Sequence, residues 1–302
     1  MLKDKVAVIT GAGGGIGRDF ALAMAAKGAK VVVNDLGVSV SGEGKDAGPA
    51  QKVVDEIKAK GGTAVASTDS VADWEAANRI VKTAIDAFGR IDVVVNNAGI
   101  LRDRFFFNMS VEEWKAVIDV HLNGTFYVSR AAATFFKNQN SGRYINMTST
   151  SGLVGNVGQA NYAAAKMGIV GHTRVTALDM ARYNVTANCI SPFAWTRLIG
   201  TIPTDTPEQK ARVAKLEKMS PRDIAPLAVY LASDDAGQVS GQIFGVRGKE
   251  IFMFSQPRPV RAIHRGDGWT PERLAETFRG TLGHHLVPLE SSAQYFSYDP
   301  LV

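Results

Sequence analysis

The chain has 302 residues, of which 45% are hydrophobic, and this is enough for a sizeable buried core in one large domain or two small ones. Its formal charge of +5 does not by itself predict a nucleic-acid partner, because no segment concentrates Lys and Arg among aromatic residues. The single cysteine, Cys189, excludes a disulfide framework within the chain. Neither a secretory signal nor a membrane span is read from the sequence, so we expect a cytoplasmic protein with no membrane partner.

Short β-branched runs alternate with longer segments of helical periodicity along the first 250 residues or so. The runs predict seven strands, at 6–10, 30–35, 64–67, 91–95, 142–147, 185–190 and 242–246. The segments between them predict helices near 15–28, 48–60, 72–88, 111–138, 161–182 and 221–233. This alternation predicts an α/β fold in which a doubly wound, parallel, seven-stranded sheet is covered by helices on both faces.

Three segments interrupt the alternation. Residues 36–49 form a loop rich in Gly and Ser after the second strand, and residues 193–219 form a polar excursion after the sixth. Excursions at the carboxyl ends of strands often cover ligands. After Ser255 the pattern ends, so we divide the chain into a principal domain, 1–255, and a C-terminal extension, 256–302, that packs on it.

A glycine-rich turn follows the first strand and leads directly into the first helix. Glycine lets the backbone approach a pyrophosphate closely, and the helix N-terminus offers N–H groups and the positive end of a dipole. The turn therefore predicts a dinucleotide phosphate site, although its spacing departs from G-x-G-x-x-G and strand-to-helix packing alone would also explain it. The residues that we assign to this site are Gly11, Gly13, Gly15, Ile16 and Gly17.

Asp35 ends the second strand eighteen positions after Gly17, near the ~20-residue offset at which a carboxylate binds the adenosine ribose. Its charge would repel the 2′-phosphate of NADP, so we expect NAD; the alternative is a turn that Gly37 completes. Polar turns also follow the third and fourth strands, at the same edge of the predicted sheet. From these turns we assign to the cofactor site Asp69, Ser70, Asn97, Ala98 and Gly99.

A tyrosine and a lysine, Tyr162 and Lys166, lie four positions apart in a predicted helix, and Ser149 lies thirteen positions before the tyrosine, at the end of a strand. Because residues i and i+4 share a helix face, the ammonium of Lys166 can lie beside the phenol and lower its pKa. A tyrosine titrates near ~10, and general acid–base catalysis needs a pKa closer to the operating pH. Ser149 could then hold the reacting oxygen.

The glycine turn, the Asn-rich turn at 96–99, Ser149 and the Tyr-x-x-x-Lys pair resemble, in this order, the short-chain dehydrogenase/reductase family over about residues 3–250. The resemblance implies a Rossmann-type dehydrogenase domain that binds a nicotinamide cofactor and a small-molecule substrate. It implies that Tyr162 is the acid–base, that Lys166 holds the ribose and that Ser149 orients the substrate oxygen. It also implies a homodimer or homotetramer; no metal or nucleic acid is expected.

Longer matches are similar to the (3R)-hydroxyacyl-CoA dehydrogenase branch of this family, which occurs in peroxisomal multifunctional enzyme type 2; they lie at 34–37, 87–104, 120–122 and 158–162. This branch implies a role in lipid metabolism. It would also account for His121, which stands where the wider family has Asn, and which is either a catalytic relay group or a packed, hydrogen-bonded histidine. Phe193, Ala194 and Trp195 follow Pro192 in place of the glycine common in the family. We assign Trp195 to the cofactor site, with packing of the excursion or contact with a bulky acyl group as the alternatives.

The sequence thus predicts an NAD-dependent enzyme that interconverts a secondary alcohol and a ketone, a 3-hydroxyacyl-CoA and its 3-oxoacyl-CoA. One alternative is the same fold acting on a steroid, an acyl-carrier-protein thioester or another carbonyl compound. A second alternative, of another class, is a module that binds the dinucleotide without turnover.

Overall fold

The computed structural model describes residues 1–302 except 40, 45–47, 195–205, 207–209, 211–212 and 215–216. The strands of the described part are β1 (Val6–Thr10), β2 (Lys30–Asn34), β3 (Thr63–Ser67), β4 (Val93–Asn96), β5 (Gly142–Met147), β6 (Val185–Phe193), β7 (Ile243–Arg247) and β8 (Glu250–Met253). They form one sheet in the order β3-β2-β1-β4-β5-β6-β7-β8. The reversal of strand order on either side of β1 is the doubly wound pattern that the sequence predicts.

The first seven strands are parallel, as predicted, but the sheet has an eighth strand that the sequence analysis missed. β8 pairs antiparallel with β7 after a tight turn in which Gly248 has a φ of +58°. This strand has only four residues, and its exposed Ile251 and Met253 alternate with partly buried neighbours. A half-exposed edge strand of this kind lacks the continuous apolar run by which buried parallel strands are recognised.

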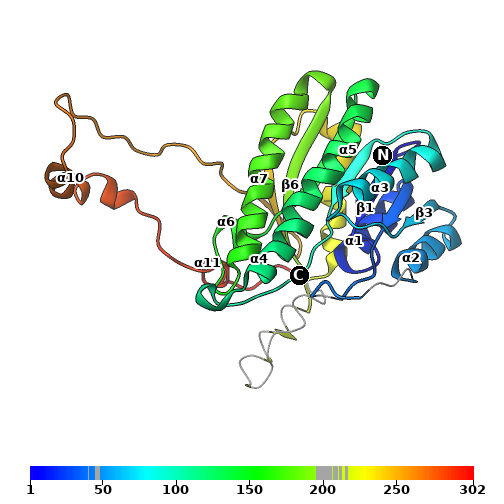
Figure 1. Cartoon of the computed structure of the whole chain (residues 1–302), viewed down its shortest axis with the longest axis horizontal. Helices are drawn as coiled ribbons and strands as arrows, with labels where there is room; N and C mark the ends of the chain where they lie inside the picture. Colours follow the sequence, from blue (N-terminus) through cyan, green and yellow to red (C-terminus); the bar gives the residue numbers. More distant parts are fainter. Residues whose placement is uncertain (40, 45–47, 195–205, 207–209, 211–212, 215–216) are drawn as a thin grey trace.

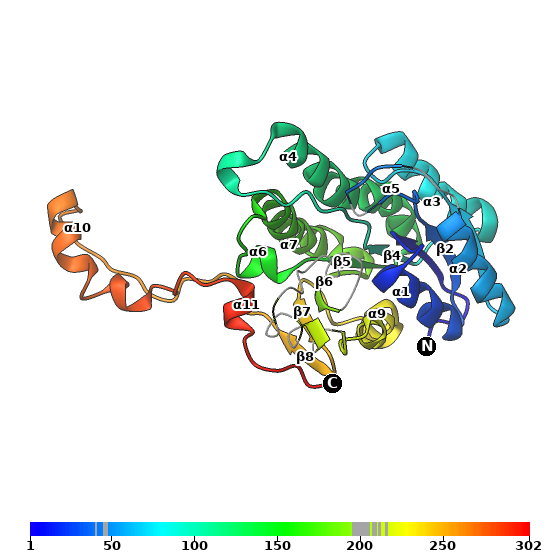
Figure 2. The same cartoon turned by 90° about the horizontal axis from the view of Figure 1, so that it is seen from below.

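Helices cover both faces of the sheet (Figure 1, Figure 2). The longer and site-forming helices are α1 (Gly15–Ala26), α2 (Gly48–Ala59), α3 (Trp74–Phe88), α4 (Val111–Ile118), α5 (Gly124–Gln139), α6 (Thr150–Leu153), α7 (Ala160–Met180) and α9 (Ala225–Ala232). Alternate strand residues belong to two cores: Ala7 and Ile9 pack with α1, α2 and α9, whereas Val6 and Val8 pack with α3, α5 and α7. The period of two in a strand therefore builds a core on each face.

The predicted helix over 111–138 is interrupted in the structure. A π-helical turn, η2 (Asp119–Asn123), separates α4 from α5 and carries the buried His121. Single π turns within α-helices often occur at functional sites. The interruption places this histidine against the residues of the candidate site.

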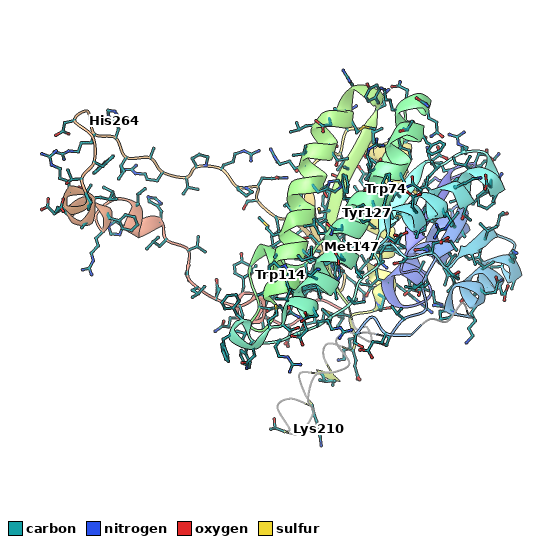
Figure 3. The ribbon with its side chains drawn as sticks, viewed as in Figure 1. Trp74, Trp114, Tyr127, Met147, Lys210 and His264 are labelled. Carbon is teal, nitrogen blue, oxygen red and sulfur yellow. The ribbon has the colours of Figure 1, made fainter. Side chains whose placement is uncertain are left out.

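After β8 the chain leaves the body as an extended arm that carries α10 (Pro271–Phe278), and then returns to α11 (Ser292–Tyr295) (Figure 1). Figure 3 shows His264 far out on this arm, while Met147 lies within the body. At the return, the Ser292 amide donates to Gly155 O at 2.7 Å, and its hydroxyl lies 2.6 Å from that of Thr150. The division into domains at residue 255 stays a prediction.

No helix in the described part of the chain is both long enough and apolar enough to cross a bilayer. The cytoplasmic location also stays a prediction.

Candidate active site

The glycine turn at 11–17, which follows β1, is joined by hydrogen bonds to the residues that follow β4. The side-chain amide of Asn97 donates to Thr10 O and Gly11 O, both at 3.0 Å. In return, the Thr10 hydroxyl accepts the backbone N–H groups of Asn97 and Ala98, at 3.0 and 3.1 Å. Asn97 and Ala98 thus fix the shape of the loop through these hydrogen bonds, and their contact with a cofactor stays a prediction.

The turn and the start of α1 suit an anion. Gly14, at the N-cap, has no side chain to cap the helix, and the first turn of α1 contains no acidic residue. Gly11 and Gly15 have φ values of +63° and +52°, which other residues adopt only with strain. The first N–H groups of a helix have no partner within it. A pyrophosphate would satisfy them, so Gly11, Gly13, Gly15, Ile16 and Gly17 fit the predicted cofactor.

Close packing explains the glycine at position 17. A Cβ there would lie 2.3 Å from Gly11 O and 2.5 Å from Asn97 Nδ2, so Gly17→Ala must displace the loop. We expect this variant to bind the dinucleotide at least roughly tenfold more weakly, since about 1.4 kcal/mol is lost with a distorted anion site. Gly171→Ala is the control, because a Cβ at this other helical glycine meets nothing within 4 Å. Fluorescence titration with NADH measures both; equal affinities in the two variants would contradict the assignment.

Asp35 lies directly after β2 and contacts the glycine turn. Its Oδ2 accepts the Gly13 N–H at 2.8 Å, and its Oδ1 accepts the Gly37 N–H at 2.7 Å. The structure therefore combines the two sequence interpretations, a turn with Gly37 and a carboxylate beside the phosphate loop. Each carboxylate oxygen has a further lone pair, so ribose hydroxyls can still be bound.

Asp69 and Ser70 follow β3 at the same sheet edge, but their contacts are within the protein. The Asp69 carboxylate pairs with Arg79 at 2.7 Å, and its backbone carbonyl accepts from Asn34 Nδ2 at 2.9 Å. The Ser70 hydroxyl accepts the N–H of Ala72 at 3.2 Å. Their assignment to the adenine and ribose stays a prediction.

His121 is packed, buried and neutral. A Cβ on Gly99 would lie 2.3 Å from His121 Cε1, so glycine at 99 makes room for the imidazole. His121 Nε2 lies 3.1 Å from the N and 2.8 Å from the O of Ile100, and Nδ1 has no hydrogen-bond partner among the described residues. Burial, and then the charge of Lys166, hold the His121 pKa well below its usual value. These contacts fit a packed, hydrogen-bonded histidine, and the catalytic relay role of His121 stays a prediction.

The predicted serine, tyrosine and lysine meet at the carboxyl end of β5. Ser149 is the N-cap of α6, its hydroxyl accepts the Ser151 N–H at 3.1 Å, and its side chain is close enough to the Tyr162 phenol to lower that phenol's pKa. Lys166 Nζ lies 5.4 Å from the centroid of the Tyr162 ring. The His121 ring packs edge-on against that ring at 5.1 Å. The helical i, i+4 spacing of tyrosine and lysine accounts for their proximity.

Burial sets the pKa values of this pair. Desolvation raises the pKa of Tyr162 to about 12; the Ser149 hydrogen bond lowers it, and the charge of Asp103 raises it. Desolvation lowers the pKa of Lys166 to about 7. The expectation that the lysine brings the phenol's pKa below its ordinary value is therefore wrong for this structure, because burial penalises the charged forms of both groups.

Lys166 is held in place by one backbone carbonyl and one hydroxyl, and it lies inside the protein. Only 4% of the residue is exposed, and Nζ donates to Met147 O at 2.7 Å. The hydroxyl of Thr148 donates to Lys166 O at 2.8 Å. These bonds tie α7 to the end of β5, and so fix the ammonium beside the phenol.

Comparison with known families agrees with this geometry. Residues 5–198 match the family described as short chain dehydrogenase. The chain belongs to the short-chain dehydrogenase family. The predicted fold class and resemblance are thereby confirmed, as is the oxidoreductase class of the family.

Relatives of this dehydrogenase are similar over most of its length. It is 45% identical to peroxisomal multifunctional enzyme type 2 of Mus musculus, over 91% of this chain but only 36% of that enzyme. It is 41% identical to the hydroxyacyl-CoA dehydrogenase ChsB1 of Mycobacterium tuberculosis, over 92% of this chain and 88% of that one. A crystal structure of a short chain dehydrogenase from Mycobacterium avium is 42% identical, with a TM-score of 0.83 over 96% of this chain and 98% of that one.

Asn161 is a site residue that the sequence analysis missed. It is fully buried, and its side-chain amide donates to Arg102 O at 3.0 Å and Glu113 O at 3.1 Å. Its Oδ1 accepts the N–H of Tyr162 at 2.7 Å. Asn161 therefore sets the start of α7, and its position next to the tyrosine is the signal that could have found it.

Trp195, which the sequence assigns to the cofactor site, lies outside the described residues. Among those that the structure describes, no cluster of three or more His, Cys, Asp or Glu could hold a metal ion.

Proposed function

We propose that the chain is an NAD-dependent oxidoreductase that interconverts a 3-hydroxyacyl-CoA and its 3-oxoacyl-CoA. The observation that carries this proposal is the meeting of Ser149, Tyr162 and Lys166 at the end of β5, two strands along the sheet from the glycine turn of β1. The name of the relative from Mycobacterium tuberculosis supports a hydroxyacyl-CoA as the substrate.

The side chains divide the chemistry with the cofactor. Bound nicotinamide would accept the hydride that the carbinol carbon loses on oxidation, or return it on reduction. Tyr162 Oη takes the hydroxyl proton during oxidation and gives a proton to the carbonyl oxygen during reduction. Ser149 hydrogen-bonds the substrate oxygen, whose charge changes in the reaction. Lys166, when protonated, stabilises the phenolate and binds the ribose of the cofactor.

The raised pKa of Tyr162 has different consequences for ketone reduction and for alcohol oxidation. A phenol with a pKa of about 12 holds its proton at neutral pH, so it is ready to act as the acid for ketone reduction. Alcohol oxidation needs the phenolate as base. Turnover in this direction therefore rises with pH as the ionised fraction grows.

Asp35 is the proposed basis of the preference for NAD. Asp35→Asn keeps an oxygen that can accept from Gly13 or Gly37 but removes the charge that would meet a 2′-phosphate. We expect the ratio of kcat/KM for NAD over NADP to fall roughly tenfold or more, equivalent to about 1.4 kcal/mol. The control is Asp55→Asn, a carboxylate on α2 that bonds to Gln51. A wild-type enzyme that prefers NADP, or an unchanged ratio in Asp35→Asn, contradicts this role.

Exposed apolar side chains on α5 and α7 support the proposal of a homodimer or homotetramer. Phe126, Met167, Val175 and Leu178 have exposed fractions of 46%, 42%, 55% and 70%. Association through the two helices would bury this surface. Light scattering coupled to size-exclusion chromatography measures the mass; a monomer contradicts the proposal.

The proposed activity is tested by absorbance of reduced nicotinamide with a panel of 3-hydroxyacyl-CoA thioesters, the matching acyl-carrier-protein and pantetheine thioesters, and hydroxysteroids. We expect the highest kcat/KM with a CoA thioester and NAD. Preference for another member of the panel would reassign the substrate. Absence of turnover with every member, together with dinucleotide binding, would instead indicate the non-catalytic module.

A further inference from the structure

A chain of hydrogen-bonded side chains leads from the site serine to the protein surface. We propose that Gln159, held by Asp103, acts through Ser151 as a positioning residue that sets the direction in which the Ser149 hydroxyl donates its hydrogen. The inference rests on the proposed function, in which Ser149 binds the substrate oxygen.

The members of the chain come from three separate segments. Gln159 Nε2 donates to Asp103 Oδ2 at 2.7 Å, and Gln159 Oε1 accepts from the Ser151 hydroxyl at 2.8 Å. Ser151 Oγ also accepts from Asn156 Nδ2 at 2.9 Å. Finally, the Ser149 hydroxyl donates to Ser151 Oγ at 3.2 Å. The chain is therefore continuous from Asp103 to the site.

The carboxylate at one end sets the direction of every bond. A carboxylate only accepts, so the amide NH₂ of Gln159 must face Asp103, and its carbonyl must face Ser151. The Ser151 hydroxyl then donates to this carbonyl, and its oxygen is left to accept. Asn156 supplies one hydrogen and Ser149 the other. The Ser149 proton is thus directed at Ser151.

The direction of the Ser149 O–H bond determines whether this hydroxyl offers a hydrogen or a lone pair to the site. With its proton directed at Ser151 and one lone pair taken by the Ser151 N–H, the Ser149 hydroxyl has one lone pair left for another donor. To donate to a substrate oxygen, Ser149 must turn its hydroxyl from Ser151 to the substrate, so the strength of the chain affects how readily Ser149 binds the reacting oxygen.

The backbone keeps the chain's two loops together. Arg104 N donates to Gly158 O at 2.8 Å, and Arg104 forms an isolated parallel bridge with Gln159. The Asn161 side chain ties the start of α7 to Arg102 O. Asp103 lies between these two attachments. The geometry of the Asp103–Gln159 bond is therefore set by main-chain contacts as well as by the side chains.

The chain orients groups; it does not conduct protons. A relay from Tyr162 to the surface at Asp103 would have to pass through the amide of Gln159, which holds its N–H protons at ordinary pH. Hydrogen bonds that run in one direction do, however, polarise one another. Replacing one side chain of this hydrogen-bonded chain should therefore lower kcat about as much as replacing two of them.

Charge provides a second test, because four groups influence the phenol: three lie close to it, and Asp103 acts through its charge from the far end of the hydrogen-bonded chain. They are Asp103 after β4, His121 in η2, Ser149 before α6 and Lys166 in α7. His121 is neutral, and Lys166, with a pKa of about 7, loses its charge at the alkaline pH where oxidation rises, so Asp103 is the charged group of this set there. The negative charge of Asp103 raises the Tyr162 pKa. Removing it should shift alcohol oxidation to lower pH, and adding a charge nearby should do the opposite.

The kinetic experiment uses Ser151→Ala, Gln159→Leu, the double variant, and Val157→Ala as control, since Val157 is 76% exposed on the same loop. With the best substrate of the wild type, each single variant should lose roughly tenfold in kcat, the effect of about one hydrogen bond. The double variant should lose no more than a single one, with unchanged dinucleotide affinity. In the pH profile, Asp103→Asn should move the rise in oxidation to lower pH, and Gln159→Glu to higher pH. Losses that multiply, or unmoved profiles, overturn the proposal.

Neutron diffraction from the deuterated wild-type protein tests the same proposal without turnover. The deuterium of Ser149 should point to Ser151 Oγ, and that of Ser151 to Gln159 Oε1. A Ser149 deuterium that points to the Tyr162 oxygen overturns the proposal. The two failures are distinguishable: silence of the wild type with every substrate counts against the proposed function, whereas the neutron result judges the hydrogen-bond chain alone.

Discussion

Tyr162→Phe should lower kcat in both directions by roughly 10² to 10⁴-fold, the contribution of a positioned general acid–base. The phenol lies near Ser149 and beside Lys166, and phenylalanine keeps the ring while it removes the hydroxyl, the only group of this side chain that exchanges a proton. The ring contact with His121 is retained. Steady-state absorbance of reduced nicotinamide gives kcat, and fluorescence titration gives the affinity for the dinucleotide.

Dinucleotide affinity and thermal stability distinguish this loss from misfolding. The affinity and the stability should both stay close to the wild-type values, because we propose that the pyrophosphate binds at the glycine turn that follows β1. Tyr183→Phe is the matched control, since this tyrosine lies at the far end of α7, in contact with Lys137 and Arg182. A Tyr162→Phe enzyme with near-wild-type turnover would refute the assignment of the acid–base.

Lys166→Met should also abolish most turnover, by roughly 10²-fold or more, because a preorganised cation beside a developing phenolate is lost. The same variant should change how stability depends on pH. Burial lowers the pKa of Lys166 to about 7 from 10.5 in the unfolded chain. Between these values the unfolded state binds a proton that the folded state lacks, so the free energy of unfolding of the wild type rises with pH.

The free energy of unfolding of the wild type rises most steeply with pH above the pKa that Lys166 has in the folded state. There the slope approaches about 1.4 kcal/mol per pH unit for one group. Below pH 7 both states are protonated, and the cost of burying the ammonium is fully present. Lys166→Met lacks this titration, so the free energy of unfolding of the wild type should rise relative to that of the variant by about 2 kcal/mol between pH 7 and pH 9. Urea unfolding at several pH values measures the difference. Parallel curves for the two proteins would contradict a buried, titrating lysine; the exposed Lys82→Met is the control.

Periodicity in the sequence predicted most of the fold. Continuous apolar runs revealed the seven parallel strands because both faces of the sheet are buried. Residues of β1 belong alternately to the two cores, which confirms that both faces are covered. The short edge strand β8 and the π turn at 119–123 were missed. Neither changes the hydrophobic pattern enough to be seen, since one has four half-exposed residues and the other inserts a wider turn into an otherwise continuous helix.

The site was predictable as far as local spacing defines it. Tyr162 and Lys166 are neighbours because of the helix between them, so their proximity could be expected from four positions of sequence. The direction of the Tyr162 pKa shift could not, because desolvation depends on what the rest of the chain packs around the phenol. The hydrogen-bonded chain from Asp103 to Ser149 joins segments up to 56 residues apart, and nothing in the local sequence pairs them.

Transfer of an isotope label tests the central claim most directly. A 3-hydroxyacyl-CoA that carries deuterium on C3 is incubated with the wild-type protein and NAD, and the dinucleotide is analysed by mass spectrometry. We predict that the reduced dinucleotide gains one deuterium for each ketone formed, and that Tyr162→Phe slows this transfer without diverting the label. Deuterium that appears in water, or a ketone formed while the dinucleotide stays unlabelled, would contradict hydride transfer at this site.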